Sequence, residues 1–106
     1  MFRTLDAQHD RFPLKAPFRI ARGVKTAADV VTVTISEAGI AGRGEAVPYP
    51  RYGESPESTL AAIETMRTLL EQGASRETLL EALPAGAARN ALDCALWDLE
   101  ARLSGR

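Results

Sequence analysis

The fold is decided by residues 86–105, which read GAARNALDCALWDLEARLSG. Apolar residues recur in this segment at steps of three and four, so they share one face of a helix. These residues are Ala88, Leu92, Ala95, Leu96, Leu99 and Leu103. Gly86 can open the helix after Pro84, and Gly105 is a suitable C-terminal cap. We therefore expect one long helix over residues 86–105.

The apolar surface of this helix is wider than a single stripe. Ala91, Cys94, Trp97 and Ala101 extend it around the helix. A helix that is apolar over much of its circumference needs partners on more than one side, yet the sequence stops directly after it. Two interpretations stay open: a central helix of a small domain, or a helix at a domain junction whose second partner is absent.

The composition is that of an ordinary globular chain. Its 106 residues, 45% hydrophobic and 25% charged, allow one domain with a modest core. The net charge of −1 favours neither nucleic acid nor an anionic membrane as a partner. Neither a signal peptide nor a membrane span is recognisable, so we expect the protein in the cytoplasm. Cys94, the only cysteine, excludes an internal disulfide, and its apolar helical setting predicts a buried, unreactive thiol.

Strands come first in the chain. We expect a first strand over residues 2–14, in which the apolar face changes partway, as at a β-bulge, although Pro13 could also end it. Apolar and polar residues alternate most clearly over residues 30–36. A short turn at residues 37–39 leads back into a third strand over residues 40–47. Together these segments predict a three-stranded antiparallel meander.

Two glycines, Gly42 and Gly44, lie inside the third expected strand. Interior glycines weaken a strand unless backbone or a ligand must come close. They do not form a phosphate-binding loop, because a third glycine and a following helix are missing.

Helices follow the strands. Residues 55–57 read Ser-Pro-Glu, which combines an N-cap, proline at the first helical position and an acid near the positive end of the helix dipole. We expect this helix to end at Gly73 and a short helix to follow over residues 75–83. Strands followed by helices predict an α+β domain, with a helical bundle laid on one face of the meander.

Two irregular segments carry residue types that are common in binding sites. Residues 15–27 are punctuated by proline and glycine and concentrate positive charge, on Lys15, Arg19, Arg22 and Lys25. They form either a solvated loop or a flap that binds a carboxylate or phosphate, for which the planar arginine fork is suited. Residues 48–54 hold both tyrosines, an arginine and two prolines. They form either a surface connection or a second flap over a small-molecule site.

The residues do not by themselves define a reaction, and we predict no catalytic residue and no metal ligand. His9, the only histidine, fits a half-exposed strand position better than a catalytic one. Asp93 and Asp98 stand five apart on one helix, so they fit polar groups at a junction better than a metal site. Glu45 and Glu54 are single acids without a visible partner.

Three segments resemble the N-terminal capping domain of the enolase superfamily. They are residues 43–46 (RGEA), 48–55 (PYPRYGES) and 83–99 (LPAGAARNALDCALWDL). Together with residues 18–23 (FRIARG) they are most similar to the muconate-lactonizing subgroup and its dipeptide epimerases, in particular those that interconvert L-Ala-D-Glu and L-Ala-L-Glu. The resemblance covers essentially the whole chain.

This resemblance implies a capping domain over residues 1–85 and a helix over residues 86–106 that bridges to a modified TIM barrel. A barrel needs about 250 residues, so this chain cannot contain one and is expected to be only part of the enzyme. In this family the paired lysine bases, the three acidic Mg²⁺ ligands and the acidic contacts to the substrate amine lie on the barrel. None of them can be carried over to this chain, which we expect to be inactive alone.

The resemblance also implies that this chain contributes substrate specificity. In the family two cap loops, here residues 18–25 and 49–54, close over the barrel and contact the distal part of the substrate. Arg22 stands where an arginine pairs with the glutamate side-chain carboxylate, and Tyr52 would help to exclude water. The implied reaction is a 1,1-proton transfer on a dipeptide such as L-Ala-D/L-Glu, in murein peptide metabolism. Whether the enzyme forms a homo-oligomer stays open.

Two other hypotheses stay open. The cap could belong to another enzyme of the superfamily, of the muconate cycloisomerase or o-succinylbenzoate synthase type. Alternatively, the chain is a self-standing binding or oligomerisation module that presents its last helix to a partner. An intact mass near 11.4 kDa would favour the module. A mass larger by roughly 27 kDa, the weight of a ~250-residue barrel, would favour the capping domain.

Overall fold

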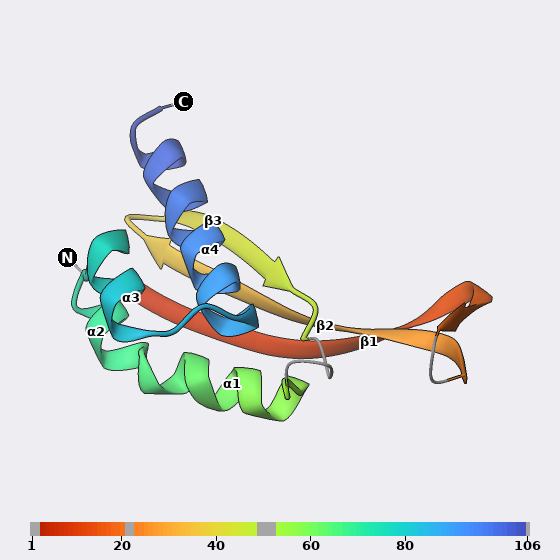
Figure 1. The fold of residues 1–106 in the computed structure, drawn as a ribbon. Coiled ribbons are helices and arrows are strands. Elements are labelled where there is room, and N and C mark those ends of the chain that lie inside the picture. Colours follow the sequence, from red (N-terminus) through yellow and green to blue (C-terminus); the bar gives the residue numbers. More distant parts are fainter. Residues whose placement is uncertain (1–2, 21–22, 49–52, 106) are drawn as a thin grey trace.

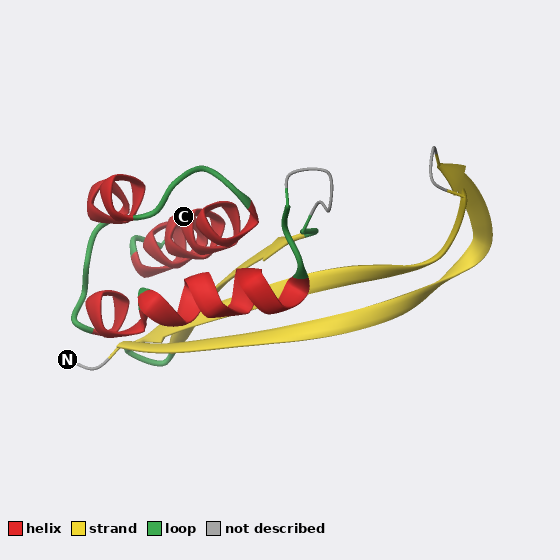
Figure 2. Ribbon diagram, turned by 60° about the horizontal axis from the view of Figure 1, so that its bottom comes forward, coloured by secondary structure: helices red, strands yellow, loops and turns green. Residues whose placement is uncertain are grey.

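The computed structural model describes residues 3–20, 23–48 and 53–105, in which three strands precede four helices. The elements are β1 (Arg3–Ile20), β2 (Gly23–Glu37), β3 (Ile40–Ala46), α1 (Pro56–Thr65), α2 (Arg67–Glu71), α3 (Arg76–Ala82) and α4 (Ala87–Leu103). The strands form one antiparallel sheet in the order β1-β2-β3, and the helices lie on one of its faces (Figures 1 and 2). The predicted α+β class, a meander followed by helices, is confirmed. Within the part of the chain that the structure describes, no helix is long and apolar enough to cross a membrane.

A two-residue turn joins β2 to β3 at the predicted place. Ala38 and Gly39 both have positive φ, 54° and 77°, which is the geometry of a tight hairpin turn. The turn sets the register of the two strands, and with it the face to which each side chain points. Val31, Val33 and Ile35 consequently face the helices and are fully buried.

The first two strands are longer than the sequence pattern predicted. β1 continues to Ile20 and β2 begins at Gly23, so the expectation of an irregular segment over residues 15–27 is wrong for its described part. The pairing register is regular from Arg3 to Pro13 and shifts only between Pro13 and Phe18, so the irregularity lies later than the change of face suggested, and Pro13 does not end the strand. Proline is tolerated there because β1 is an edge strand. Figure 2 shows the β1–β2 hairpin projecting beyond the helices. A strand that packs against no helix needs no alternation of apolar and polar residues, so hydrophobic periodicity does not predict this part of the hairpin.

The core lies between the sheet and the helices, and α4 contributes more buried residues to it than any other helix. Its seven buried residues are Ala87, Ala88, Ala91, Leu92, Ala95, Leu96 and Leu99. The helix begins after Gly86 and ends before Ser104 and Gly105, as predicted. α4 shares its core with the sheet and the other helices, so it packs as part of this domain. The division into a capping domain (residues 1–85) and a bridging helix (residues 86–106) stays a prediction.

The two glycines inside β3 allow α4 to lie directly on the strand. A Cβ atom on Gly42 would lie 2.6 Å from the Cβ of Leu99 and would also collide with the backbone of Ala95. A Cβ atom on Gly44 would lie 2.7 Å from the nitrogen of Ala95 and would also collide with the carbonyl oxygen of Ala91. These glycines therefore mark a close approach of helix backbone to strand backbone.

The helix expected between Ser55 and Gly73 is divided in two. Its start is as predicted: Ser55 caps α1, and its side chain and that of Ser58 each accept from the other's backbone N–H. The helix breaks at Met66, whose N–H bonds to the carbonyl oxygen of Ile63, three residues back. The expectation of one continuous helix is therefore wrong.

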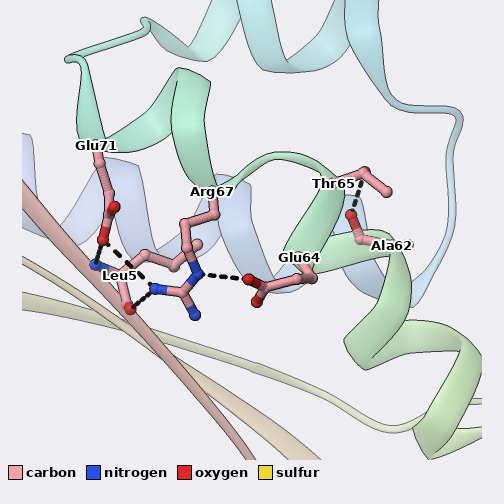
Figure 3. A network of polar contacts seen from close by, with 6 residues as sticks. All are labelled: Leu5, Ala62, Glu64, Thr65, Arg67 and Glu71. Atoms are coloured by element: carbon pink, nitrogen blue, oxygen red, sulfur yellow. Dashed lines mark hydrogen bonds and ion pairs between the residues drawn. The ribbon is translucent and has the colours of Figure 1, made fainter.

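The break directs two side chains of α2 onto the free edge of β1 (Figure 3). Arg67 Nη1 donates to the carbonyl oxygen of Leu5 at 2.6 Å, and the N–H of Leu5 donates to Glu71 Oε2 at 3.1 Å. Arg67 also pairs with Glu64 at 2.8 Å. Arg67 and Glu71 together satisfy the carbonyl oxygen and the N–H of Leu5, as a further strand would do.

The opposite edge of the sheet is covered by α4. The backbone N–H of Arg43 in β3 donates to Asp98 Oδ2 at 2.9 Å, and Arg102 Nε donates to Asp98 Oδ1 at 3.1 Å. The hydrogen bond from the Arg43 backbone, aided by Arg102, holds the pKa of Asp98 below its usual value of 3.8. Asp98 thus supports the same helix–strand contact that the glycines permit.

The close approach predicts that Gly44→Ala destabilises the domain by about 1–3 kcal/mol, because the new methyl group has no space against the backbone of α4. The matched control is Ala41→Ser, on the exposed face of the same strand, which should change the free energy of unfolding by less than about 0.5 kcal/mol. Chemical denaturation followed by circular dichroism measures both. Equal stability of Gly44→Ala and the wild type would contradict the packing described above.

The bonds of Asp98 predict a pH-dependent contribution to stability. Because its pKa is lower in the folded than in the unfolded chain, its contribution is present above the unfolded value and is lost as the pH falls through the folded pKa. Asp98→Asn should therefore lower the denaturation midpoint at pH 7, and its difference from the wild type should shrink at pH 3. Asp6→Asn, at an exposed position of β1, is the control. A difference from the wild type that is as large at pH 3 as at pH 7 would refute this role.

Candidate functional site

The two candidate substrate-binding residues, Arg22 and Tyr52, both lie outside the described residues. The structure does describe the residues that flank the two segments in which Arg22 and Tyr52 lie. Ile20 and Gly23 form the last described pair of the β1–β2 hairpin. Pro48 and Gly53 stand on either side of residues 49–52, between β3 and α1.

The hairpin that leads towards Arg22 is tied together by an ion-pair cluster. Asp29 on β2 accepts from Arg11 Nε at 2.9 Å and lies 2.8 Å from His9 Nε2, both on β1. The hydrogen bond from Arg11, followed by that with His9, holds the pKa of Asp29 below its usual value. His9, whose side chain is 29% exposed, is therefore a paired strand residue, as predicted. The backbone register places Arg19 opposite Val24, close to the end of the hairpin.

The second segment returns to the domain at Glu54. The Oε2 atom of Glu54 accepts a hydrogen bond of 2.7 Å from the backbone N–H of Ala87, at the start of α4. Sequence reasoning described Glu54 as an acid without a visible partner, and this is wrong. The partner is a backbone group 33 residues further along the chain, which no side-chain pattern reveals.

A hollow of about 550 Å³ adjoins this contact, between the end of β3 and the start of α4. Its lining consists of Ala46, Val47, Glu54, Ala85, Gly86, Ala87 and Asn90. Val47 is 52% exposed there. The hollow therefore lies beside the point where residues 49–52 leave and rejoin the described chain.

Among the described residues, no group of three or more histidine, cysteine, aspartate or glutamate side chains could hold a metal ion. Asp93 binds Arg76 through two hydrogen bonds, of 2.6 and 3.2 Å, and the hydrogen bond from Arg76 is short enough to raise the pKa of that guanidinium. Asp98 bonds to the backbone of Arg43 and to Arg102. The described residues therefore do not fit a Mg²⁺ ion, and we assign no chemical step of this chain to one.

Two uncharged side chains of α4, those of Trp97 and Cys94, are exposed. Trp97 is 61% exposed, and the guanidinium of Arg76 lies 4.4 Å from the centre of its ring, as in a cation–π contact. Cys94 is exposed as well, so the expectation of a buried thiol is wrong. The sheet takes up only one side of α4. The wide apolar surface noted in the sequence therefore includes residues that the sheet does not cover.

Residues 3–106 match the family described as "Mandelate racemase / muconate lactonizing enzyme, N-terminal domain". Because the match spans almost the whole sequence, the chain belongs to this family of N-terminal domains. The resemblance to the enolase-superfamily capping domain is thereby confirmed.

Two curated relatives are similar to this chain. It is 56% identical over 100 residues to the L-Ala-D/L-Glu epimerase of Escherichia coli (strain K12), and the aligned region covers 94% of this chain and 31% of that protein. It is 42% identical over 80 residues to the N-acetyl-D-glutamate racemase of a Pseudoalteromonas species, which covers 73% of this chain and 25% of that protein. The chain thus spans about a third or less of the length of either relative.

Solved structures of dipeptide epimerases have the same fold. An enolase family member from Agrobacterium tumefaciens with homology to dipeptide epimerases, with bound sodium and L-Ala-L-Glu, superposes with a TM-score of 0.94 at 52% identity, over 98% of this chain and 32% of that one. The dipeptide epimerase from Methylococcus capsulatus, complexed with Mg and L-Arg-D-Lys, superposes with a TM-score of 0.82 at 36% identity, over 99% of this chain and 33% of that one.

Proposed function

We propose that this chain is the N-terminal capping and specificity domain of a Mg²⁺-dependent dipeptide epimerase that interconverts L-Ala-D-Glu and L-Ala-L-Glu. The observation that carries the proposal is the 56% identity to an L-Ala-D/L-Glu epimerase over 94% of the chain. The similarity to a solved structure with bound L-Ala-L-Glu supports it.

The proposal divides the work between two parts of one enzyme. The catalytic bases and the Mg²⁺ ligands belong to a barrel outside this chain. When bound there, the metal would stabilise the negative charge that develops on the substrate as its α-proton is removed. A metal in similar dipeptide epimerase structures supports Mg²⁺ as the cofactor. The chain alone is inactive in this proposal, and the complete enzyme works in the cytoplasm on murein peptides.

Arg22 and Tyr52 are the proposed substrate-binding residues. The glutamate at the C-terminus of the dipeptide carries a side-chain carboxylate, and a planar guanidinium can bind it through two charge-assisted hydrogen bonds. Such a pair is strong in a closed site from which water is excluded, and the tyrosine ring would contribute to that exclusion. The paired hairpin, braced by Asp29, supplies a defined support for the segment that carries Arg22.

A second candidate activity is the racemisation of N-acetylglutamate. The 42% identity to an N-acetyl-D-glutamate racemase favours it. The two candidate substrates share one chemical feature: each is a glutamate whose nitrogen is acylated, by alanine in one case and by acetate in the other. They differ in the free amine of the alanyl residue. This activity ranks second because the identity and the coverage are both lower.

The proposed function predicts which substrate the complete enzyme prefers. With Mg²⁺ in deuterated water, proton NMR should show exchange of the glutamate α-proton of L-Ala-L-Glu, with a kcat/KM at least about tenfold above that for N-acetyl-D-glutamate, or about 1.4 kcal/mol in transition-state binding. The 106-residue chain is the control and should catalyse no exchange. The reverse order of substrates would establish the racemase, and exchange by neither would refute both proposals.

The role of Arg22 predicts a selective loss. Arg22→Ala in the complete enzyme should lower kcat/KM for L-Ala-L-Glu by about 100-fold or more, the cost of about 3 kcal/mol for a charge-assisted pair. The value for a dipeptide with a neutral second residue, such as L-Ala-L-Leu, should change much less. Arg43→Ala, at an exposed arginine of β3 away from this hairpin, is the matched control for removing an arginine. Equal losses on both dipeptides would remove Arg22 from the recognition of glutamate.

A further inference from the structure

Glu54 supplies the carboxylate at the N-terminus of α4. The first N–H groups of a helix lack partners within the helix, and the N-terminal end carries a partial positive charge. Gly86 is the N-cap residue and has no side chain, and the first turn of α4 contains no acid. The side chain of Glu54, 33 residues away in the chain, therefore caps α4 through its 2.7 Å hydrogen bond from the N–H of Ala87.

Gly86 makes room for this contact. A Cβ atom at position 86 would lie 2.9 Å from Glu54 Oε2, closer than an unstrained contact allows. The carboxylate is at the end of a flexible side chain, so it would be displaced rather than the helix. A bare glycine at position 86 thus leaves α4 without a cap of its own and admits the carboxylate of Glu54.

The residue after Glu54 is fixed as well, to a different helix. Ser55 Oγ accepts from the N–H of Ser58 at 3.0 Å, and the N–H of Ser55 donates to Ser58 Oγ at 2.9 Å. Adjacent residues therefore hold the starts of α1 and α4 together. α4 in turn lies on Gly42 and Gly44 of β3. The position of Glu54 is therefore fixed relative to β3, the strand that precedes residues 49–53 in the chain.

We propose that Glu54 is a positioning residue for substrate binding in the complete enzyme. Its contact with Ala87 holds in place the end of the segment that carries Tyr52, without touching the substrate or the reacting atoms. The inference rests on the proposed function, in which that segment contacts the distal part of the dipeptide. When the anchor is lost, only a fraction of the molecules holds the segment as the substrate requires, so the apparent affinity falls by that fraction while the chemical step is unchanged.

The test changes the contact from both sides in the complete enzyme. Glu54→Ala removes the carboxylate that accepts from the backbone N–H of Ala87, and Gly86→Ala displaces that carboxylate while Glu54 is intact. Each should raise the KM for L-Ala-L-Glu by about five- to tenfold with kcat within about twofold. The double variant should be no worse than the more affected single variant, because both changes remove one contact. Glu57→Ala, at an exposed acid in the first turn of α1, is the matched control and should change neither constant.

Melting temperatures recorded for the same variants separate a positioning role from a purely structural one. Lower melting temperatures of Glu54→Ala and Gly86→Ala with wild-type KM values would overturn the inference and leave Glu54 as a helix cap only. Additive effects of the two changes on KM would overturn it as well. If the wild-type enzyme turns over no dipeptide, the proposed function fails first and the inference with it. Wild-type turnover with unchanged variants refutes the role of Glu54 alone.

Discussion

The structure depends on the contact between α4 and β3, in which helix backbone lies directly on strand backbone. Gly42 and Gly44 permit it from the strand, and the small residues Ala91 and Ala95 permit it from the helix. Close packing of this kind leaves no freedom in the position of the helix, because any added methyl group meets main-chain atoms rather than a movable side chain. The sheet and the longest helix therefore form one rigid unit.

Other features of the domain follow from that unit. The position of α4 brings Asp98 to the outer edge of β3 and presents the N–H of Ala87 to Glu54. At the opposite edge, Arg67 and Glu71 serve Leu5 in the same way. Helix side chains thus satisfy backbone groups at both edges of a three-stranded sheet, which would otherwise be open to pairing with other chains.

The domain carries the segments that contain Arg22 and Tyr52 at points set by this body. One lies at the end of a hairpin that extends beyond the helices, and the other leaves β3 and returns at Glu54 beside the start of α4 (Figures 1 and 2). A scaffold that holds two segments in defined places can recognise a substrate without taking part in the reaction. This matches the proposed division of work, in which specificity belongs to this chain and the chemistry to a barrel.

Much of the fold could be predicted from the sequence, because its signals are local. The ends of α4, the Ser55 cap and the turn at Ala38 and Gly39 each depend on a few neighbouring residues. The errors concern features that depend on distant parts of the chain or on what a segment packs against. The extended β1–β2 hairpin is defined by backbone pairing between residues that carry no alternating pattern. The helix break at Met66 is followed by Arg67 and Glu71, which bind the backbone of Leu5, more than 60 residues away in the chain.

The candidate site was less accessible to sequence reasoning. Arg22 and Tyr52 were named through a resemblance, since no pattern of charge or spacing assigns them a ligand. The bond between Glu54 and Ala87 joins an acid to a main-chain group, so only the fold reveals it. Cys94 was expected to be buried because it stands on an apolar helix, but burial depends on which face the sheet covers.

The most direct test of this account is a structure of the complete protein with bound L-Ala-L-Glu. In that structure we expect Arg22 to contact the side-chain carboxylate of the glutamate, Tyr52 to lie against the same end of the dipeptide, and Glu54 to keep its bond to Ala87. A glutamate carboxylate bound only by residues outside residues 1–106 would contradict the central claim that this domain determines specificity.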